Sequence, residues 1–118
     1  MGNSMMVPFC CSRALDIYKK TGNQSGEANT YRLLGNTSSL RRDWESAQRL
    51  FADSLALNIK CGNRLGAAEV ERDTVKMMIA RGYREDAMDS LESAHDAFKT
   101  LGAEADEAEV AELLATMG

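Results

Sequence analysis

Apolar residues recur at steps of three and four along most of this chain. The clearest run contains Ala47, Leu50, Phe51, Ser54, Leu55, Asn58 and Cys61. This spacing places the residues on one face of an α-helix. The same reading predicts helices over about residues 8–21, 25–40, 44–61, 65–80, 83–101 and 104–117.

The predicted helix ends repeat with a period of forty residues. Gly22, Gly62 and Gly102 share one phase, and Ala28, Ala68 and Ala108 share another. Each glycine follows an apolar-periodic run, at the position where a helix end often needs a positive φ. A fixed period in this range is typical of stacked repeats. The pattern therefore predicts an all-α fold of about six helices, arranged as antiparallel hairpins.

Residues 28–61 resemble a tetratricopeptide repeat (TPR). The matching positions are Tyr31, Leu34, Gly35, Asp43-Trp44-Glu45-Ser46-Ala47, Phe51 and Ser54. A second copy matches at residues 82–87 and at Leu91, with Thr74 and Val75 in place of the leucine and glycine. The resemblance implies helical hairpins stacked as a right-handed superhelix. HEAT-type repeats also have periods near forty and stay as an alternative, although they lack the Gly…Ala pairing.

The forty-residue spacing is similar to that of the longer repeats in kinesin light chains and in the Leu-Gly-Asn-repeat spindle adaptors. Leu34-Gly35-Asn36 spells that motif, and Leu33 stands where the adaptors usually carry a peptide-holding Asn. The resemblance divides residues 1–118, as a single domain, into a disordered lead (1–7), a half repeat (8–24), two repeats (25–64 and 65–103) and a half repeat (104–118).

Charge and cysteine content narrow the class of partner. The net charge is −4, but residues 1–60 carry eight Lys/Arg and five Asp/Glu, whereas residues 61–118 carry six and thirteen. A +3 front and a −7 back argue against a nucleic-acid footprint over the whole domain. No apolar run is long enough to span a membrane. Three cysteines, an odd number, favour a reducing compartment, and we expect a cytoplasmic protein.

The family's groove positions, carried onto this sequence, imply a peptide-binding face on the first helix of each hairpin. They are Asn29, Arg32, Asn36 and Ser39, followed by Glu69, Arg72, Lys76 and Ile79. Arg32 and Asn36 resemble the basic–Asn pair with which chaperone-binding repeats hold a C-terminal carboxylate. The expected ligand is an acidic or carboxylate-bearing peptide. The alternative is an ordinary solvated helix face.

The half repeats at the two ends predict self-association. The last predicted helix has an apolar stripe with no following helix, formed by Val110, Leu113, Leu114 and Met117. Such ends usually carry polar caps. The basic first half of one copy could bind the acidic second half of another, giving a homodimer or a head-to-tail array.

The sequence contains few residue patterns typical of a catalytic site or a metal site. Glu92 and His95 have the E-x-x-H spacing of di-metal bundles, but the chain has only one His. The acidic row Glu85, Asp89, Glu92 and Asp96 is interpreted as an outer surface. We expect no enzyme, metal or cofactor, and a protein-interaction module instead. A self-assembling structural unit and a regulatory piece of a larger signalling or transcription protein are the alternatives.

Overall fold

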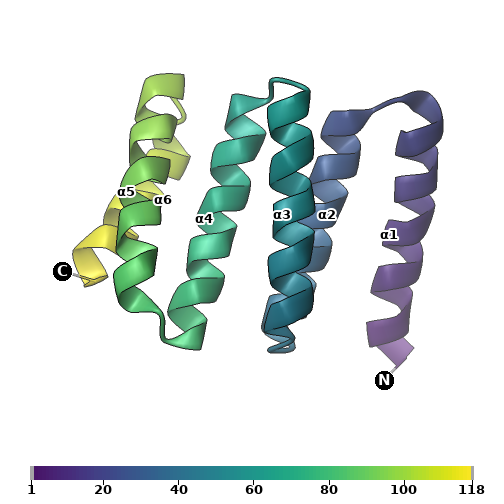
Figure 1. Ribbon diagram of the computed structural model, residues 1–118, viewed down its shortest axis with the longest axis horizontal. Helices are drawn as coiled ribbons and strands as arrows, with labels where there is room; N and C mark the ends of the chain where they lie inside the picture. Colours follow the sequence, from purple (N-terminus) through teal and green to yellow (C-terminus); the bar gives the residue numbers. More distant parts are fainter. Residues whose placement is uncertain (1, 118) are drawn as a thin grey trace.

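The chain folds into six helices, and each lies beside its neighbour in the sequence (Figure 1). In this computed structural model the backbone is described for residues 2–117 and the side chains for residues 12–116. The helices are α1 (Gly2–Thr21), α2 (Gln24–Leu40), α3 (Trp44–Lys60), α4 (Arg64–Arg81), α5 (Arg84–Leu101) and α6 (Glu104–Met117). The described residues thus confirm the predicted all-α class, and the bounds of α2 to α6 agree closely with the predictions.

Consecutive helices run in opposite directions, and the view in Figure 1 places α2 behind α3 and α6 behind α5. Contacts join each helix to the next, and α2 also contacts α4. A face of the molecule is therefore built jointly by α2 and α4, which are separated in sequence by the whole of α3.

The first helix differs from the prediction. Residues 1–7 were expected to form a disordered lead, but α1 begins at Gly2 and runs through Pro8. The fixed φ of proline is compatible with a helix, although inside a helix its missing N–H removes one backbone hydrogen bond and its ring crowds the carbonyl four residues earlier. The preference of proline for the first turn, on which the expected start at Pro8 was based, therefore does not hold for this helix.

The five turns repeat every twenty residues, and each contains a residue with positive φ. Gly22, Gly62, Gly82 and Gly102 occupy four of them, with φ between 70° and 93°. The fifth is Arg42, with φ 61°. The left-handed conformation costs a non-glycine residue about 1 kcal/mol, because Cβ crowds the following carbonyl oxygen. The glycine stops predicted from the sequence are confirmed, and Arg42 is the exception among the described turns.

The repeated Gly-Asn-x-x-Gly motif has a structural cause. Asn23 and Asn63 are helix N-caps, and their side chains accept hydrogen bonds from the backbone N–H groups of Gly26 and Gly66 at 2.9 and 3.0 Å. A Cβ on Gly26 would lie 2.6 Å from the ring of Tyr18. These glycines therefore let the preceding helix pack closely against the start of the next one.

Two clusters of buried apolar side chains form the core. One joins α4, α5 and α6 through Ala68, Val75, Ala87, Leu91, Ala94, Phe98 and Val110. The other joins α3 and α4 through Ala47, Phe51, Val70 and Met77. Among the repeat-matching positions, Phe51 and Leu91 are buried, whereas Tyr31 and Leu34 are only half-buried. Both side chains belong to α2, which is followed toward the N-terminus only by α1.

None of the helices in the described part of the chain has both the length and the apolar content needed to cross a lipid bilayer.

Candidate functional site

A chain of charged side chains links α2, α4 and α6. At its centre is Asp73 on α4, which is only 5% exposed. Its Oδ2 accepts hydrogen bonds from Nη1 of Arg32 at 2.7 Å and from Nδ2 of Asn36 at 2.9 Å, both on α2. The Arg32 guanidinium also donates to Oδ1 of Asn29 at 2.9 Å. Asp73 thus fixes the α2 face against α4.

Arg72 continues the network from α4 to α6. Its side chain is buried, and Nη1 donates to Oδ1 of Asp106 at 2.6 Å and lies 3.7 Å from Oε2 of Glu109. Its Nε lies 3.4 Å from Oδ1 of Asp73. Burial lowers the pKa of Arg72, but the carboxylates of Asp73, Glu109 and Asp106 together outweigh burial and raise the pKa above its ordinary value. The guanidinium is therefore held charged inside the fold.

The network closes with an ion pair between Lys76 on α4 and Glu109 on α6, both partly exposed. All three cationic side chains predicted to bind an acidic peptide thus have carboxylate partners within the chain. They are Arg32, Arg72 and Lys76. Asp73, Asp106 and Glu109 balance their charge. The predicted basic groove is, along this row, electrically neutral.

Two pockets open along the surface shared by α2 and α4. One has a volume of about 340 Å³ and is polar, with Asn29, Arg32 and Glu69 among its lining residues. The other has a volume of about 480 Å³ and is lined in part by Asn36, Ser39 and Lys76. The Arg32–Asp73 hydrogen bond links the two, since each pocket contains one of its partners. We call this surface the α2–α4 groove.

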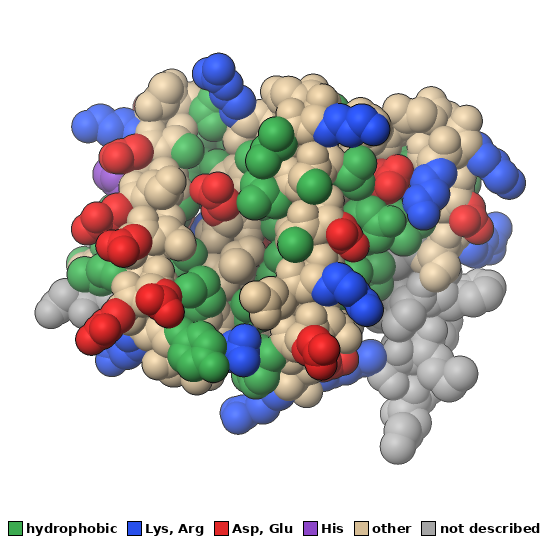
Figure 2. Space-filling model, in the orientation of Figure 1, with side chains coloured by type: hydrophobic (Ala, Val, Ile, Leu, Met, Phe, Trp, Pro, Cys, Tyr) green, Lys and Arg blue, Asp and Glu red, His purple; other side chains and the backbone are tan. Residues whose placement is uncertain are grey.

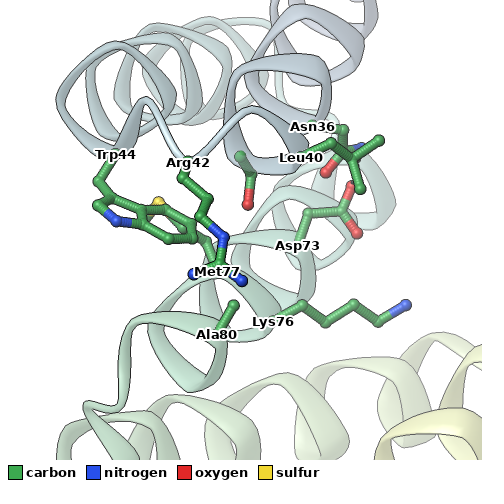
Figure 3. Close-up of a pocket in the computed structure, with 9 residues that line it drawn as sticks. Asn36, Leu40, Arg42, Trp44, Asp73, Lys76, Met77 and Ala80 are labelled. Atoms are coloured by element: carbon green, nitrogen blue, oxygen red, sulfur yellow. Dashed lines mark hydrogen bonds between the residues drawn. The ribbon is translucent and has the colours of Figure 1, made fainter.

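The larger pocket is lined by apolar side chains and by one further cationic side chain, that of Arg42. Leu40, which is 88% exposed, and Trp44 lie on either side of it, with Met77 and Ala80 between them. Figure 3 shows the side chain of Arg42 extending from the α2–α3 turn toward Met77, over this apolar surface. Among the described side chains, no ion pair involves Arg42. The pocket therefore offers a guanidinium that has no carboxylate of its own.

Sequence reasoning missed Arg42, because family groove positions lie on helices and Arg42 lies in a turn. The sequence does contain a signal for it: glycine stands at positions 22, 62, 82 and 102, and the same twenty-residue spacing places Arg42 where a glycine is expected. A non-glycine residue at a position that needs positive φ is strained, and such strain concentrates at functional sites.

Two residues predicted for the groove lie elsewhere. Arg72 is 8% exposed and binds within the chain, so it is a structural residue of the network rather than a free ligand contact. Ile79 packs against the core cluster of α4, α5 and α6. An amphipathic pattern does not show which face of a helix is covered by a later helix. Here α6 covers the face of α4 that carries Arg72.

The predicted self-association stripe on α6 is also partly wrong. Val110 is fully buried, and Leu113 and Leu114 pack against the same core cluster through α5. Met117 lies outside the residues whose side chains are described. The apolar stripe of α6 packs against α5 of the same chain and is therefore not available to a second copy. The open face of α6 instead carries exposed alanines, Ala108, Ala111 and Ala115.

Candidate metal ligands are not brought together in the described residues. No group of three or more His, Cys, Asp or Glu side chains among them has a geometry that could hold a metal ion. His95 lies instead 3.6 Å from Glu107 and 4.0 Å from Asp96, at the junction of α5 and α6. Of these two neighbours, Glu107 lies on α6 and Asp96 on α5 itself, so His95 makes one contact between helices.

No known protein-family model matches this chain, and a search of the curated proteins returns no match.

Proposed function

We propose that this chain is a non-enzymatic protein-interaction module that binds a peptide segment of a partner protein along the α2–α4 groove. Its helices would stack as the hairpins of a tetratricopeptide-type superhelix, as the sequence resemblance implies. One observation carries the proposal: six residues chosen from the sequence alone line two pockets on one surface. They are Asn29, Arg32, Asn36, Ser39, Glu69 and Lys76.

The larger pocket defines the chemistry of the peptide. The network neutralises Arg32, Arg72 and Lys76, so these side chains contribute little net attraction for an acidic ligand. Arg42 has no such partner, and its planar fork suits a carboxylate. Leu40, Trp44 and Met77 beside it suit an apolar side chain. The preferred peptide therefore presents an apolar residue next to a carboxylate, with further polar contacts along α2.

The test is a binding measurement on a peptide selected against the wild-type chain from a random displayed library. Arg42→Gln removes the charge and keeps a polar, unbranched side chain, and we expect it to weaken binding about tenfold, the loss of one charged hydrogen-bonded contact. Arg42→Gly should weaken binding similarly while raising the free energy of unfolding by about 1 kcal/mol, because it relieves the positive-φ strain. Isothermal titration and chemical denaturation measure the two effects.

Arg49 provides the matched control, because it is an exposed arginine on α3 that does not line the pocket. Arg49→Gln should change affinity less than twofold, about the scatter of a surface substitution. A selected peptide that binds Arg42→Gln, Arg42→Gly and wild type equally would show that the groove is not the binding site.

Self-assembly is a second candidate function, favoured by the open face of α6. Ala28 on α2 and Ala68 on α4 are buried by the helix that follows each of them, whereas Ala108 at the same repeat position is exposed. Together with Ala111 and Ala115, it forms a row of small side chains on one helix face. The −7 charge of this half and the +3 charge of the first half favour a second copy as the helix that covers it.

Light scattering after size exclusion, at about 100 μM in low and high salt, measures this assembly. We expect a dimer or larger species at low salt that dissociates in Ala108→Glu. Ala108 is the position to change because it is exposed, whereas Leu113 of the apolar stripe packs against the core. A monomeric mass under both conditions would exclude the second candidate.

A further inference from the structure

A second hollow surface lies on the opposite side of α4, between α3 and α5. Two adjoining pockets of about 410 and 270 Å³ share Glu71 and Ser93, and together they contact α4 from Arg64 to Val75. At 1.5 Å per residue this span is about 16 Å, or three helical turns. We call it the α3–α5 trench. Figure 2, viewed from the side of α3 and α5, shows hydrophobic side chains between these helices and acidic ones gathered over α5.

Comparison of the two repeats explains why the trench is open. Forty residues earlier, the positions of Glu71, Thr74, Ser90 and Ala97 are held by Tyr31, Leu34, Leu50 and Leu57. Those four larger side chains are half-buried in the first repeat. Their replacements in the second repeat are smaller or polar, so the side chains that occupy this space in one hairpin are missing from the next.

The trench contains a carboxylate without a partner. Glu71 is partly buried, and burial raises its pKa above the ordinary value. Among the described side chains, no cation or hydrogen-bond donor is placed on it, although Arg64 and Asp96 line the same trench. A carboxylate held in this way destabilises the free protein at neutral pH and is available to a cation from outside.

We infer that the α3–α5 trench is a docking site for a basic amphipathic helix of a partner protein, with a Lys or Arg of that helix placed on Glu71. The walls of the trench are helices whose backbone groups are already paired, so an extended peptide would find no backbone partners there. A helix satisfies its own backbone and needs only side-chain contacts. The aliphatic stem of Lys or Arg also suits the apolar walls.

Charge complementarity supports a basic occupant. Asp96 lines the trench together with Glu71, and Asp89 is exposed on α5. The second half of the chain carries a net charge of −7. This site does not depend on the α2–α4 groove, since the two surfaces share no lining residue and call for ligands of opposite charge.

The test uses two synthetic 18-residue helical peptides with the same Leu/Ala stripe, one flanked by Lys and the other by Glu. Fluorescence anisotropy should show that the Lys peptide binds at least about tenfold more tightly than the Glu peptide. Glu71→Gln should weaken the Lys peptide about tenfold, because one charged contact is lost. Ser90→Leu/Ala97→Leu, which restores the residues of the first repeat, should abolish binding by filling the trench.

Glu92→Gln is the matched control, because it removes the same charge from α5 outside the trench lining. It should change affinity less than twofold. Equal weakening by Glu92→Gln and Glu71→Gln would show a diffuse electrostatic attraction and overturn the inference. Equal binding of the two peptides, or full binding to the filled trench, would overturn it as well.

Stability against pH gives a second readout without any peptide. The folded-state pKa of Glu71 is raised, so the folded chain binds more protons than the unfolded chain in the range between the two values. The contribution of Glu71 to stability therefore falls as pH rises through that range. Glu71→Gln should be more stable than wild type at neutral pH, and this advantage should shrink as the solution is acidified. A constant difference between the two proteins would contradict the unpaired carboxylate.

Discussion

Replacing Phe51 with alanine is expected to lower the free energy of unfolding by about 3–5 kcal/mol, the usual range for a buried phenylalanine. Phe51 is 2% exposed and belongs to the core cluster that joins α3 to α4. Its ring also lies against Gly35 of α2. One side chain therefore connects three helices, and the cavity left by its removal is bordered by all of them.

The contact between Phe51 and Gly35 provides a control. A Cβ on Gly35 would lie 2.7 Å from the Phe51 ring, so Gly35→Ala alone should also destabilise the fold by overpacking. In Phe51→Ala/Gly35→Ala the added methyl group has room, and the two effects should not add. Denaturant unfolding of the four proteins measures the cycle. A loss below about 1 kcal/mol for Phe51→Ala would mean that the ring does not carry this junction.

The fold could be predicted from the sequence because its signals are local. Helix spacing depends on residues three and four apart, and the glycine stops at 22, 62, 82 and 102 require only the conformation of one residue. Asp43 and Trp44 mark the start of α3 in the same way, since the Asp43 side chain accepts the N–H of Ser46. The extension of α1 through Pro8 was missed because proline usually marks the first turn of a helix and is unfavourable inside one.

The site was harder to predict, because its charges are paired by residues far away in sequence. Arg32 and Asp73 are separated by 41 positions, and Arg72 and Asp106 by 34. A helical pattern places each side chain on a face but does not say what the facing helix carries. Only the structure shows that Asp73 and Glu109 are the carboxylate partners of Arg32 and Lys76.

The charge network predicts that its members differ greatly in their effect on stability. Arg72→Met keeps much of the side-chain volume and removes the charge, and we expect a loss of about 3–5 kcal/mol. Arg72 is 8% exposed, and its removal leaves Asp106 without its closest cation and Asp73 with one fewer. The guanidinium also lies 5.7 Å from the centre of the Phe98 ring, a favourable contact that Met does not reproduce.

Lys76→Met is the matched comparison on the same helix. Both Lys76 and Glu109 have more than two fifths of their side-chain surface exposed, so solvent screens their ion pair, and the expected loss is below about 1 kcal/mol. Denaturant unfolding at low and high salt measures both variants. High salt should reduce the small Lys76 effect and leave most of the Arg72 effect, since buried pairs are screened less. If Arg72→Met costs no more than Lys76→Met, the buried network does not hold α4 to α6, and Arg72 returns to the set of candidate ligand contacts.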